Sequence, residues 1–161
     1  MADSAREIEN LLYTYAERID AGDLEGVAEL FAQGRILPSP DAAREIAFEG
    51  REAVLGMYRA ATRLYEDGTP RTRHVTTNAI IEVDEATATA AARSYYTVLQ
   101  QTEALPLQPI ICGRYHDTFR RIDGRWCFAT RTMFVDLVGD LSQHLLYDLA
   151  PARRPRTART D

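Results

Sequence analysis

The stretch TRHVTTNAIIEVD, residues 72–84, marks the point where the spacing of apolar residues changes from that of helices to that of strands. Its β-branched residues favour extended backbone, and its apolar residues recur with a period of two. One predicted face contains Val75, Ala79, Ile81 and Val83, and the other contains Thr72, His74, Thr76 and Asn78. The polar face either meets solvent or lines a wet pocket inside a curved sheet, and the pattern alone leaves both open.

A run of strands is expected from this point onward. The predicted strands cover 72–83, 86–101, 108–122 and 125–136. Asp84-Glu85 joins the first pair, and Asp123-Gly124, a strong hairpin signal, joins the last pair. Turns this short connect neighbouring antiparallel strands, so the sequence predicts a long antiparallel meander.

The residues before the meander have the spacing of amphipathic helices. Helices are predicted over 4–20 with Ser4 as N-cap, over 24–32 with Asp23 as N-cap, and from about 51 to 67. A terminal helix over 138–148 is also expected. Helices followed by strands indicate an α+β fold. Because three helices can cover such long strands only if the sheet is strongly curved, the expected shape is a cone that holds a small ligand.

The composition indicates one acidic domain with a basic end. The chain has 161 residues and a net charge of −5, yet residues 151–161 hold four arginines against one aspartate. A domain over 1–150 and a disordered tail over 151–161 are expected. The acidic body disfavours nucleic acid as a partner. No apolar run approaches the roughly 20 residues of a membrane span, and the first residues lack a signal-peptide pattern, so a cytoplasmic protein without membrane contact is expected.

Three residue types restrict the chemistry further. The sequence contains no lysine, which excludes Schiff-base catalysis and a P-loop lysine. Cys112 and Cys127 lack metal-ligand spacing and are expected to be buried free thiols. The histidines show no HxH or HxxxH spacing, so neither a metal nor another cofactor is expected.

Four segments together resemble the SnoaL-like branch of the nuclear transport factor 2-like superfamily. They are YAERIDAGDLEGVAELFA (15–32), FEGREAV (48–54), TRHVTTNAIIEVD (72–84) and GRYHDTFRRIDGRW (113–126). The resemblance extends over most of residues 5–137. It implies the cystatin-like cone, a strongly curved antiparallel sheet with three helices packed on its concave face. It also implies a homodimer formed through the outer face of the sheet.

Within that superfamily the chain is similar to scytalone dehydratase-like proteins and to the small subunits of ring-hydroxylating dioxygenases. Scytalone dehydratase carries a cavity aspartate at the end of its first helix and a cavity histidine at the start of a long strand, and Asp20 and His74 match these positions. By this resemblance the polar face of the strand points inward. The dehydratase's second catalytic histidine has no counterpart in SYYTVLQ (94–100), and its cavity asparagine aligns with Tyr115. Dehydration of that family's own substrate is therefore not implied.

An imidazole beside a carboxylate is a proton-transfer unit, because the carboxylate fixes the tautomer and leaves the other nitrogen free to exchange a proton. Asp20 and His74 are the expected catalytic pair, although such a pair can also simply fill a polar hole in the core. The residues expected to bind substrate are Tyr58, Asn78, Tyr96, Tyr115, Phe119 and Trp126. Tyr115 either donates to a developing oxyanion or binds main chain as a core aromatic residue.

The remaining histidines are expected outside the site. His116 shares a strand with Tyr115, Asp117 and Phe119 but has the opposite parity, so it is predicted to face outward. His144 is expected to be a partly exposed residue of the terminal helix.

The expected function is that of a cofactor-independent lyase (dehydratase) or isomerase acting on a small apolar cyclic or aromatic molecule. The alternative is a non-catalytic ligand-binding protein, or the structural small subunit of a ring-hydroxylating dioxygenase.

Overall fold

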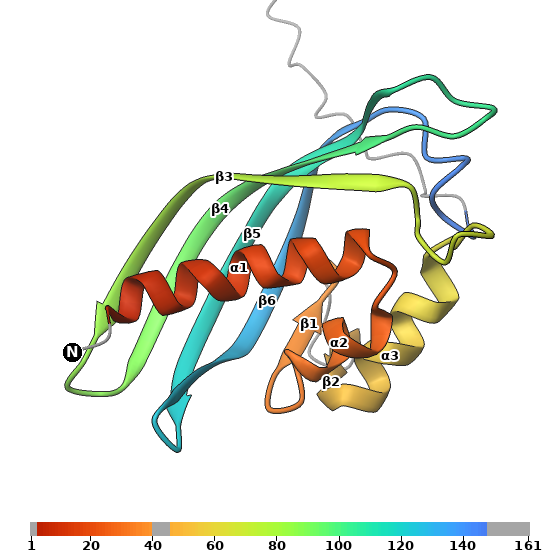
Figure 1. Cartoon of the computed structure of the whole chain (residues 1–161). Helices are drawn as coiled ribbons and strands as arrows, with labels where there is room; N and C mark the ends of the chain where they lie inside the picture. The colour runs from red at the N-terminus through yellow and green to blue at the C-terminus, as the bar shows by residue number, and fades with distance from the viewer. Residues whose placement is uncertain (1–2, 40–45, 148–161) are drawn as a thin grey trace, which may run out of the picture.

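The computed structural model describes residues 3–39 and 46–147. Its helices are α1 (Ser4–Asp20), α2 (Leu24–Glu29) and α3 (Gly50–Ala61). Its strands are β1 (Arg35–Leu37), β2 (Phe48–Glu49), β3 (Thr72–Asp84), β4 (Thr89–Gln100), β5 (Gln108–Ile122) and β6 (Arg125–Val138). A six-stranded sheet in the order β2-β1-β6-β5-β4-β3 curves around α1, while α2 and α3 lie at one end of its concave side (Figure 1). The expected α+β cone is confirmed.

The four long strands form the predicted antiparallel meander. Only the pairing of β1 with β6 is parallel among the described strands. The sequence did not predict this pair, because three residues carry no readable alternation. The pair matters for the site, since it extends the sheet beyond β6 by β1 and β2, and Phe48 of β2 lines the cavity described below.

Helix α1 has the predicted bounds, but its N-cap is Asp3, whose carboxylate accepts the main-chain N–H groups of Ala5 and Arg6. Helix α3 ends at Ala61 rather than near residue 67. The chain leaves the helix there because Thr62 pairs with Leu145 as an isolated β-bridge. The expected helix over 138–148 is wrong over its described part, where β6 continues to Val138 and turns follow up to residue 147.

A β-bulge in β3 changes the face on which its side chains lie. The register of β3 against β4 shifts between Thr77 and Ile80, and Asn78 has a φ of 55°. The extra residue shifts the alternation by one position, so His74 and the later apolar residues share the inner face. The inner-facing apolar residues are Ala79, Ile81 and Val83. The predicted apolar face is therefore wrong at Val75, which is 39% exposed on the outer side.

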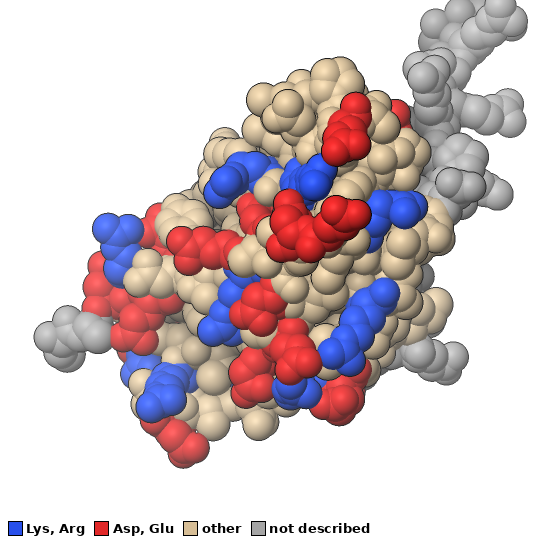
Figure 2. Space-filling view, turned by 45° about the vertical axis from the view of Figure 1, so that its right-hand side comes forward, with Lys and Arg blue, Asp and Glu red and all other residues tan. Residues whose placement is uncertain are grey.

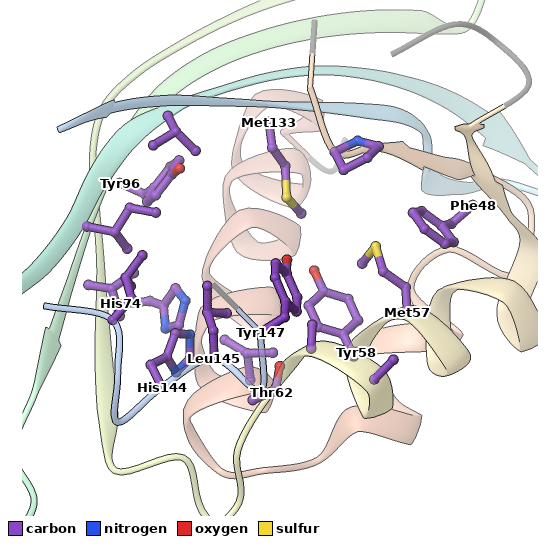
Figure 3. Close-up of a pocket in the computed structure, with 18 of the residues that line it drawn as sticks. Phe48, Met57, Tyr58, Thr62, His74, Tyr96, Met133, His144, Leu145 and Tyr147 are labelled. Carbon is purple, nitrogen blue, oxygen red and sulfur yellow. The ribbon is translucent and has the colours of Figure 1, made fainter. Parts of the chain in front are cut away.

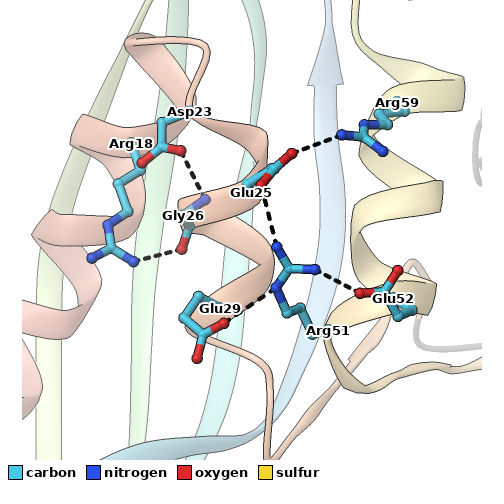
Figure 4. Close-up of polar contacts among 8 residues, drawn as sticks. All are labelled: Arg18, Asp23, Glu25, Gly26, Glu29, Arg51, Glu52 and Arg59. Atoms are coloured by element: carbon cyan, nitrogen blue, oxygen red, sulfur yellow. Dashed lines mark hydrogen bonds and ion pairs between the residues drawn. The ribbon is translucent and has the colours of Figure 1, made fainter.

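The outer surfaces of α2 and α3 are joined by ion pairs (Figure 4). Arg51 contacts Glu25 and Glu29, each at 3.3 Å, and Glu52 at 2.6 Å. Arg59 adds a contact of 3.0 Å to Glu25. Exposed pairs of this kind each contribute at most about 1 kcal/mol. Their role is to hold the outer side of α3 while its inner side stays free to line a cavity.

The surface and the cysteines complete the comparison with the sequence. Acidic and basic side chains are interspersed over the face that Figure 2 shows. No helix among residues 3–39 and 46–147 is long and apolar enough to cross a membrane. Cys112 and Cys127 are free, as expected, but half-buried rather than buried. The predicted tail over 151–161 lies outside the described residues.

Candidate active site

A cavity of about 740 Å³ lies between the concave face of the sheet, α1, α3 and the segment 141–147 (Figure 3). Its wall is mostly apolar and aromatic, as in many sites for small organic ligands. Helix α3 contributes mainly small residues, namely Ala53, Gly56, Ala60 and Ala61. The polar groups that reach this wall are few, and they gather around His74 and around a group of tyrosines.

Asp20 is the last residue of α1, and His74 is the third residue of β3. The Oδ1 atom of Asp20 lies 2.6 Å from Nδ1 of His74 and accepts a hydrogen bond of 2.8 Å from the Thr72 hydroxyl. Its Oδ2 atom accepts the main-chain N–H of His74 at 2.7 Å. The side chains of Asp20 and His74 are only 9% and 8% exposed. The expected contact between the two residues is thus present.

The charge of Asp20 fixes the tautomer of His74. Burial raises the pKa of the Asp20 carboxyl, but hydrogen bonds from His74 and Thr72 and the charge of His74 lower it more, so the net shift is downward. An ionised carboxylate can only accept hydrogen bonds, so Nδ1 of neutral His74 carries the proton. The lone pair of His74 is then on Nε2, which no described residue binds. His74 lines the cavity, and this nitrogen is available there as a base.

Tyrosines form the second polar feature of the wall. The hydroxyls of Tyr15 and Tyr58 are 2.7 Å apart, and the ring of Tyr15 meets that of His74 edge-on, with centroids 6.4 Å apart. Burial raises the pKa of Tyr58 and Tyr115 well above the usual value, so both stay protonated. Tyr96 stacks on Tyr115 at 4.4 Å and donates its hydroxyl to the carbonyl of Phe134.

A buried ion pair supports these tyrosines from behind. Arg131 and Asp117 form a bidentate ion pair, in which Nε and Nη2 of Arg131 donate to the two carboxylate oxygens of Asp117 at 2.9 and 2.8 Å. The two side chains are 1% and 0% exposed. The guanidinium of Arg131 lies 4.2 Å from the ring centroid of Tyr15 and 3.9 Å from that of Tyr115. The inward parity of Asp117 was predicted, but its partner was not. The ion pair fixes two cavity tyrosines through contacts between a cation and aromatic rings.

The structure separates the expected site residues into two sets. His74, Tyr58, Tyr96 and Tyr115 line the cavity. Asp20 lies behind His74 and borders a separate polar groove of about 420 Å³. These five residues are therefore brought together, as expected.

The other expected substrate-binding residues do not reach the cavity. Asn78 is exposed, because it occupies the bulge that changes the parity of β3. Phe119 packs on Phe128 in the core, at 4.8 Å between ring centroids. Trp126 lies beneath the guanidinium of Arg121 near the β5–β6 hairpin. The strands are longer than the cavity, and their hairpin ends pack as ordinary core, so Phe119 and Trp126, like the exposed Asn78, do not line it.

Two further cavity residues were missed or misplaced by sequence reasoning. Tyr15 is a buried residue of α1 that also lines the cavity, and no motif in the sequence points to it. His144 lies in a turn rather than a helix, is half-buried and lines the cavity. Burial and the positive charge of protonated His74 lower the pKa of His144 to about 4, although Asp20 opposes this shift. His116 is exposed on the outer face, as predicted.

No cluster of three or more His, Cys, Asp or Glu side chains that could hold a metal ion occurs within the described ranges. The groups of this site that can donate or exchange protons are the imidazoles, the phenols and the Asp20 carboxylate.

Comparisons with known proteins agree with this architecture. The solved structure of Rv3472, a protein of unknown function from Mycobacterium tuberculosis, is 27% identical, with 82% of this chain and 71% of that chain covered and a TM-score of 0.65. A candidate scytalone dehydratase from Novosphingobium aromaticivorans is 23% identical over 96% of this chain and 95% of that chain, with a TM-score of 0.67. The β subunit of a candidate aromatic-ring-hydroxylating dioxygenase from the same organism is 18% identical. The match covers 83% of this chain and 90% of that chain, with a TM-score of 0.65.

The likenesses to the candidate dehydratase and to the dioxygenase subunit, at 23% and 18% identity, show the fold alone. No curated protein matches the chain. The sequence model of the SnoaL-like domain family matches residues 1–132, which is most of the chain. On this match and on the cystatin-like fold that surrounds the cavity, the chain belongs to the SnoaL-like domain family.

Proposed function

We propose that the protein is a cofactor-independent lyase, of the dehydratase type, or an isomerase that moves a proton on a small apolar cyclic or aromatic molecule. One observation carries this proposal: Asp20 holds Nδ1 of His74 at 2.6 Å, and the ring it orients borders an apolar cavity of about 740 Å³. A fixed imidazole with a free lone pair in a mostly apolar cavity is a competent general base.

The proposed first step is removal of a carbon-bound proton next to a carbonyl group. Nε2 of His74 takes the proton, the C–H electron pair forms a C=C bond, and the carbonyl oxygen becomes an enolate. The charge of Asp20 stabilises the imidazolium that forms. In a ketone with a β,γ double bond, returning the proton to the γ carbon moves the double bond, re-forms the carbonyl and completes an isomerisation. In a β-hydroxy ketone, the enolate instead re-forms the carbonyl, a C=C bond forms as the C–OH bond breaks, and the leaving hydroxyl takes the proton from His74, so the products are an unsaturated ketone and water.

The tyrosine pair suits the negative charge that this step creates. Tyr15 and Tyr58 share one hydrogen bond, so the pair keeps one hydroxyl hydrogen that a ligand oxygen can accept. Arg131, which is paired with Asp117, stacks against the ring of Tyr15 and holds this hydroxyl donor in place. Donors that are fixed before the reaction stabilise a developing oxyanion without reorganisation. A neighbour described as a candidate scytalone dehydratase supports the proposed dehydratase type.

The proposal is tested with 2-tetralone, a bicyclic ketone with acidic protons beside its carbonyl. In deuterated buffer, NMR measures how fast these protons exchange with solvent. The wild type is expected to accelerate exchange and His74→Gln to abolish the acceleration. The matched control is His116→Gln, which changes an exposed histidine on the outer face and should leave the rate unchanged.

Two outcomes contradict the proposal. The first is binding of 2-tetralone to the wild type without faster exchange, which favours a ligand-binding protein or a structural subunit. The second is acceleration that survives in His74→Gln, which assigns the base to another group.

A further inference from the structure

The segment 141–147 closes one side of the cavity, with Leu141, His144, Leu145 and Tyr147 in its wall. Main-chain contacts hold it in place. The carbonyl of His144 accepts the N–H of Arg63 at 2.8 Å, and the N–H of Leu146 donates to the carbonyl of Ala61 at 2.9 Å. These bonds tie the segment to the end of α3, so the position of His144 does not depend on its own side chain.

A second set of contacts fixes the same segment from the connection between α3 and β3 and from the end of β4. The hydroxyl of Tyr65 donates to the carbonyl of Gln143 at 2.6 Å. The side-chain amide of Gln100 donates to that carbonyl at 3.0 Å. The residue before His144 is thus anchored by two partners. The His144 ring is held against the cavity, on the side where Figure 3 also shows His74.

Neither ring nitrogen of His144 has a hydrogen-bond partner within the described ranges. Its Nδ1 is fully buried, whereas Nε2 is not among the buried unpaired atoms and is therefore the accessible nitrogen. A buried N–H without a partner is rarer than a buried acceptor without one, so the ring proton belongs on Nε2. Burial and protonated His74 lower the pKa of His144 to about 4, so the ring is neutral near pH 7.

The two histidines therefore present complementary atoms to one cavity. His74 offers a lone pair on Nε2, because its Nδ1–H is directed at Asp20. His144 offers an N–H. A histidine with a purely structural role normally satisfies at least one of its nitrogens within the protein, and His144 does not. The accessible N–H is the kind of group that a ligand oxygen satisfies.

We propose that His144 donates a hydrogen bond to an oxygen atom of the substrate that His74 deprotonates. This inference rests on the proposed function and narrows its substrate class to cyclic ketones in which a carbonyl or hydroxyl oxygen lies close to the abstracted proton. A hydrocarbon ring without such an oxygen fills the cavity but leaves the His144 N–H unpaired. Such a ring is predicted to bind more weakly for that reason.

The test compares 2-tetralone with tetralin, which has the same two rings and no oxygen. Calorimetry gives both dissociation constants for the wild type, His144→Phe and His144→Gln. A neutral hydrogen bond is worth about fivefold in affinity, so His144→Phe is expected to weaken 2-tetralone binding by about that factor and to leave tetralin unchanged. His144→Gln retains an N–H donor and is expected to keep part of the preference for the ketone.

A second measurement needs no variant that alters the cavity. Long-range ¹H–¹⁵N NMR of wild-type protein with labelled histidine reports the tautomer of each ring. His144 is expected as the neutral Nε2–H form between pH 6 and 8, with a change of its Nε2 shift when 2-tetralone is added. The Nδ1–H form, or no change of the shift with bound ketone, overturns the inference even if His144→Phe fails to fold.

The remaining outcomes separate this inference from the proposed function. A preference for the ketone that survives in His144→Phe overturns the inference alone. A preference lost in His144→Phe, without proton exchange in the wild type, supports the role of His144 and contradicts the proposed function. Failure of both compounds to bind the wild type overturns both.

Discussion

The two carboxylate oxygens of Asp20 bind two different parts of His74, one the ring Nδ1 and the other the main-chain N–H. The carboxylate thereby ties the imidazole to the start of β3 and sets its orientation. An amide at position 20 has an N–H₂ donor in place of one of these oxygens, so one of the two His74 donors faces a group that cannot accept. The ring or the strand then loses its anchor.

Asp20→Asn is therefore expected to slow the exchange of 2-tetralone by about a hundredfold or more, the usual worth of a general base. His74→Gln should cost a similar factor, and the double variant should cost little more, because residues that act as one unit are not additive. A lowered melting temperature with unchanged ligand binding and unchanged exchange in both single variants contradicts a catalytic role for the pair.

Arg131→Met is expected to destabilise the fold by about 3–5 kcal/mol, because it leaves the Asp117 carboxylate buried without its partner. The double variant with Asp117→Leu should recover much of this loss. Urea unfolding of the three variants measures both effects. Equal stability of Arg131→Met and the double variant would show that the charge left on Asp117 is not what costs stability.

The stability of the protein is expected to fall between pH 6.5 and pH 4 because of His144. Its pKa is lowered from 6.5 to about 4 in the folded chain. Between these values the unfolded state binds more protons, so acid favours unfolding. Relative to His144→Gln, the wild type should lose about 2 kcal/mol from pH 7 to pH 5. Urea unfolding at both pH values measures this difference, and a constant difference between the two proteins contradicts the expectation.

Substitutions at Gly56 change the volume of the cavity without changing its polar groups. It lies within α3 and lines the cavity, and a Cβ added there meets no atom within 4 Å. Gly56→Ala should stabilise the helix by about 0.5–1 kcal/mol and still bind tetralin. Gly56→Leu should fold equally well but lose tetralin binding, because its side chain occupies the cavity. Calorimetry and thermal melting distinguish the two effects, and tight tetralin binding to Gly56→Leu would place the ligand elsewhere.

A homodimer through the outer face of the sheet remains a prediction. Apolar side chains are exposed on that face, with Val75 at 39%, Ile80 at 50% and Tyr95 at 53%. Burying them against a second copy removes apolar surface from water. Light scattering at micromolar concentration should give twice the chain mass, and Tyr95→Arg should give the monomer. A monomeric wild type contradicts this prediction.

Local patterns in the sequence were enough to predict most of the secondary structure. Helix α1 has the predicted bounds because its apolar stripe is regular over 17 residues. The β5–β6 hairpin follows from Asp123-Gly124, since both residues adopt the positive φ that this tight turn needs. The match of Asp20 and His74 to a known family placed the polar pair as well, because each residue lies at the boundary of a regular element.

Which side chains face the cavity and the core depended in part on the positions of two bulges. Counting outward from the Asp123-Gly124 turn pairs Asp117 with Thr130, whereas the register shift between Thr118 and Phe119 pairs it with Arg131. In the same way, the bulge at Asn78 reverses which side chains in the second half of β3 face inward, and it leaves Asn78 outside the cavity. A single extra residue reverses the face of every later side chain, and the alternation pattern does not show where it is inserted.

The sequence by itself determined the α+β class, the helix and strand pattern, and the meeting of Asp20 with His74, because these follow from periodicity, turn residues and a family match. Only the tertiary structure decided that His144 faces the same cavity as His74. Those two residues are far apart in the chain, and their meeting depends on how residues 141–147 pack against the end of α3 and against Gln100. Such long-range packing leaves no local signal, since the sequence pattern of the residues after β6 is compatible with a segment that turns toward the cavity and with one that turns away from it.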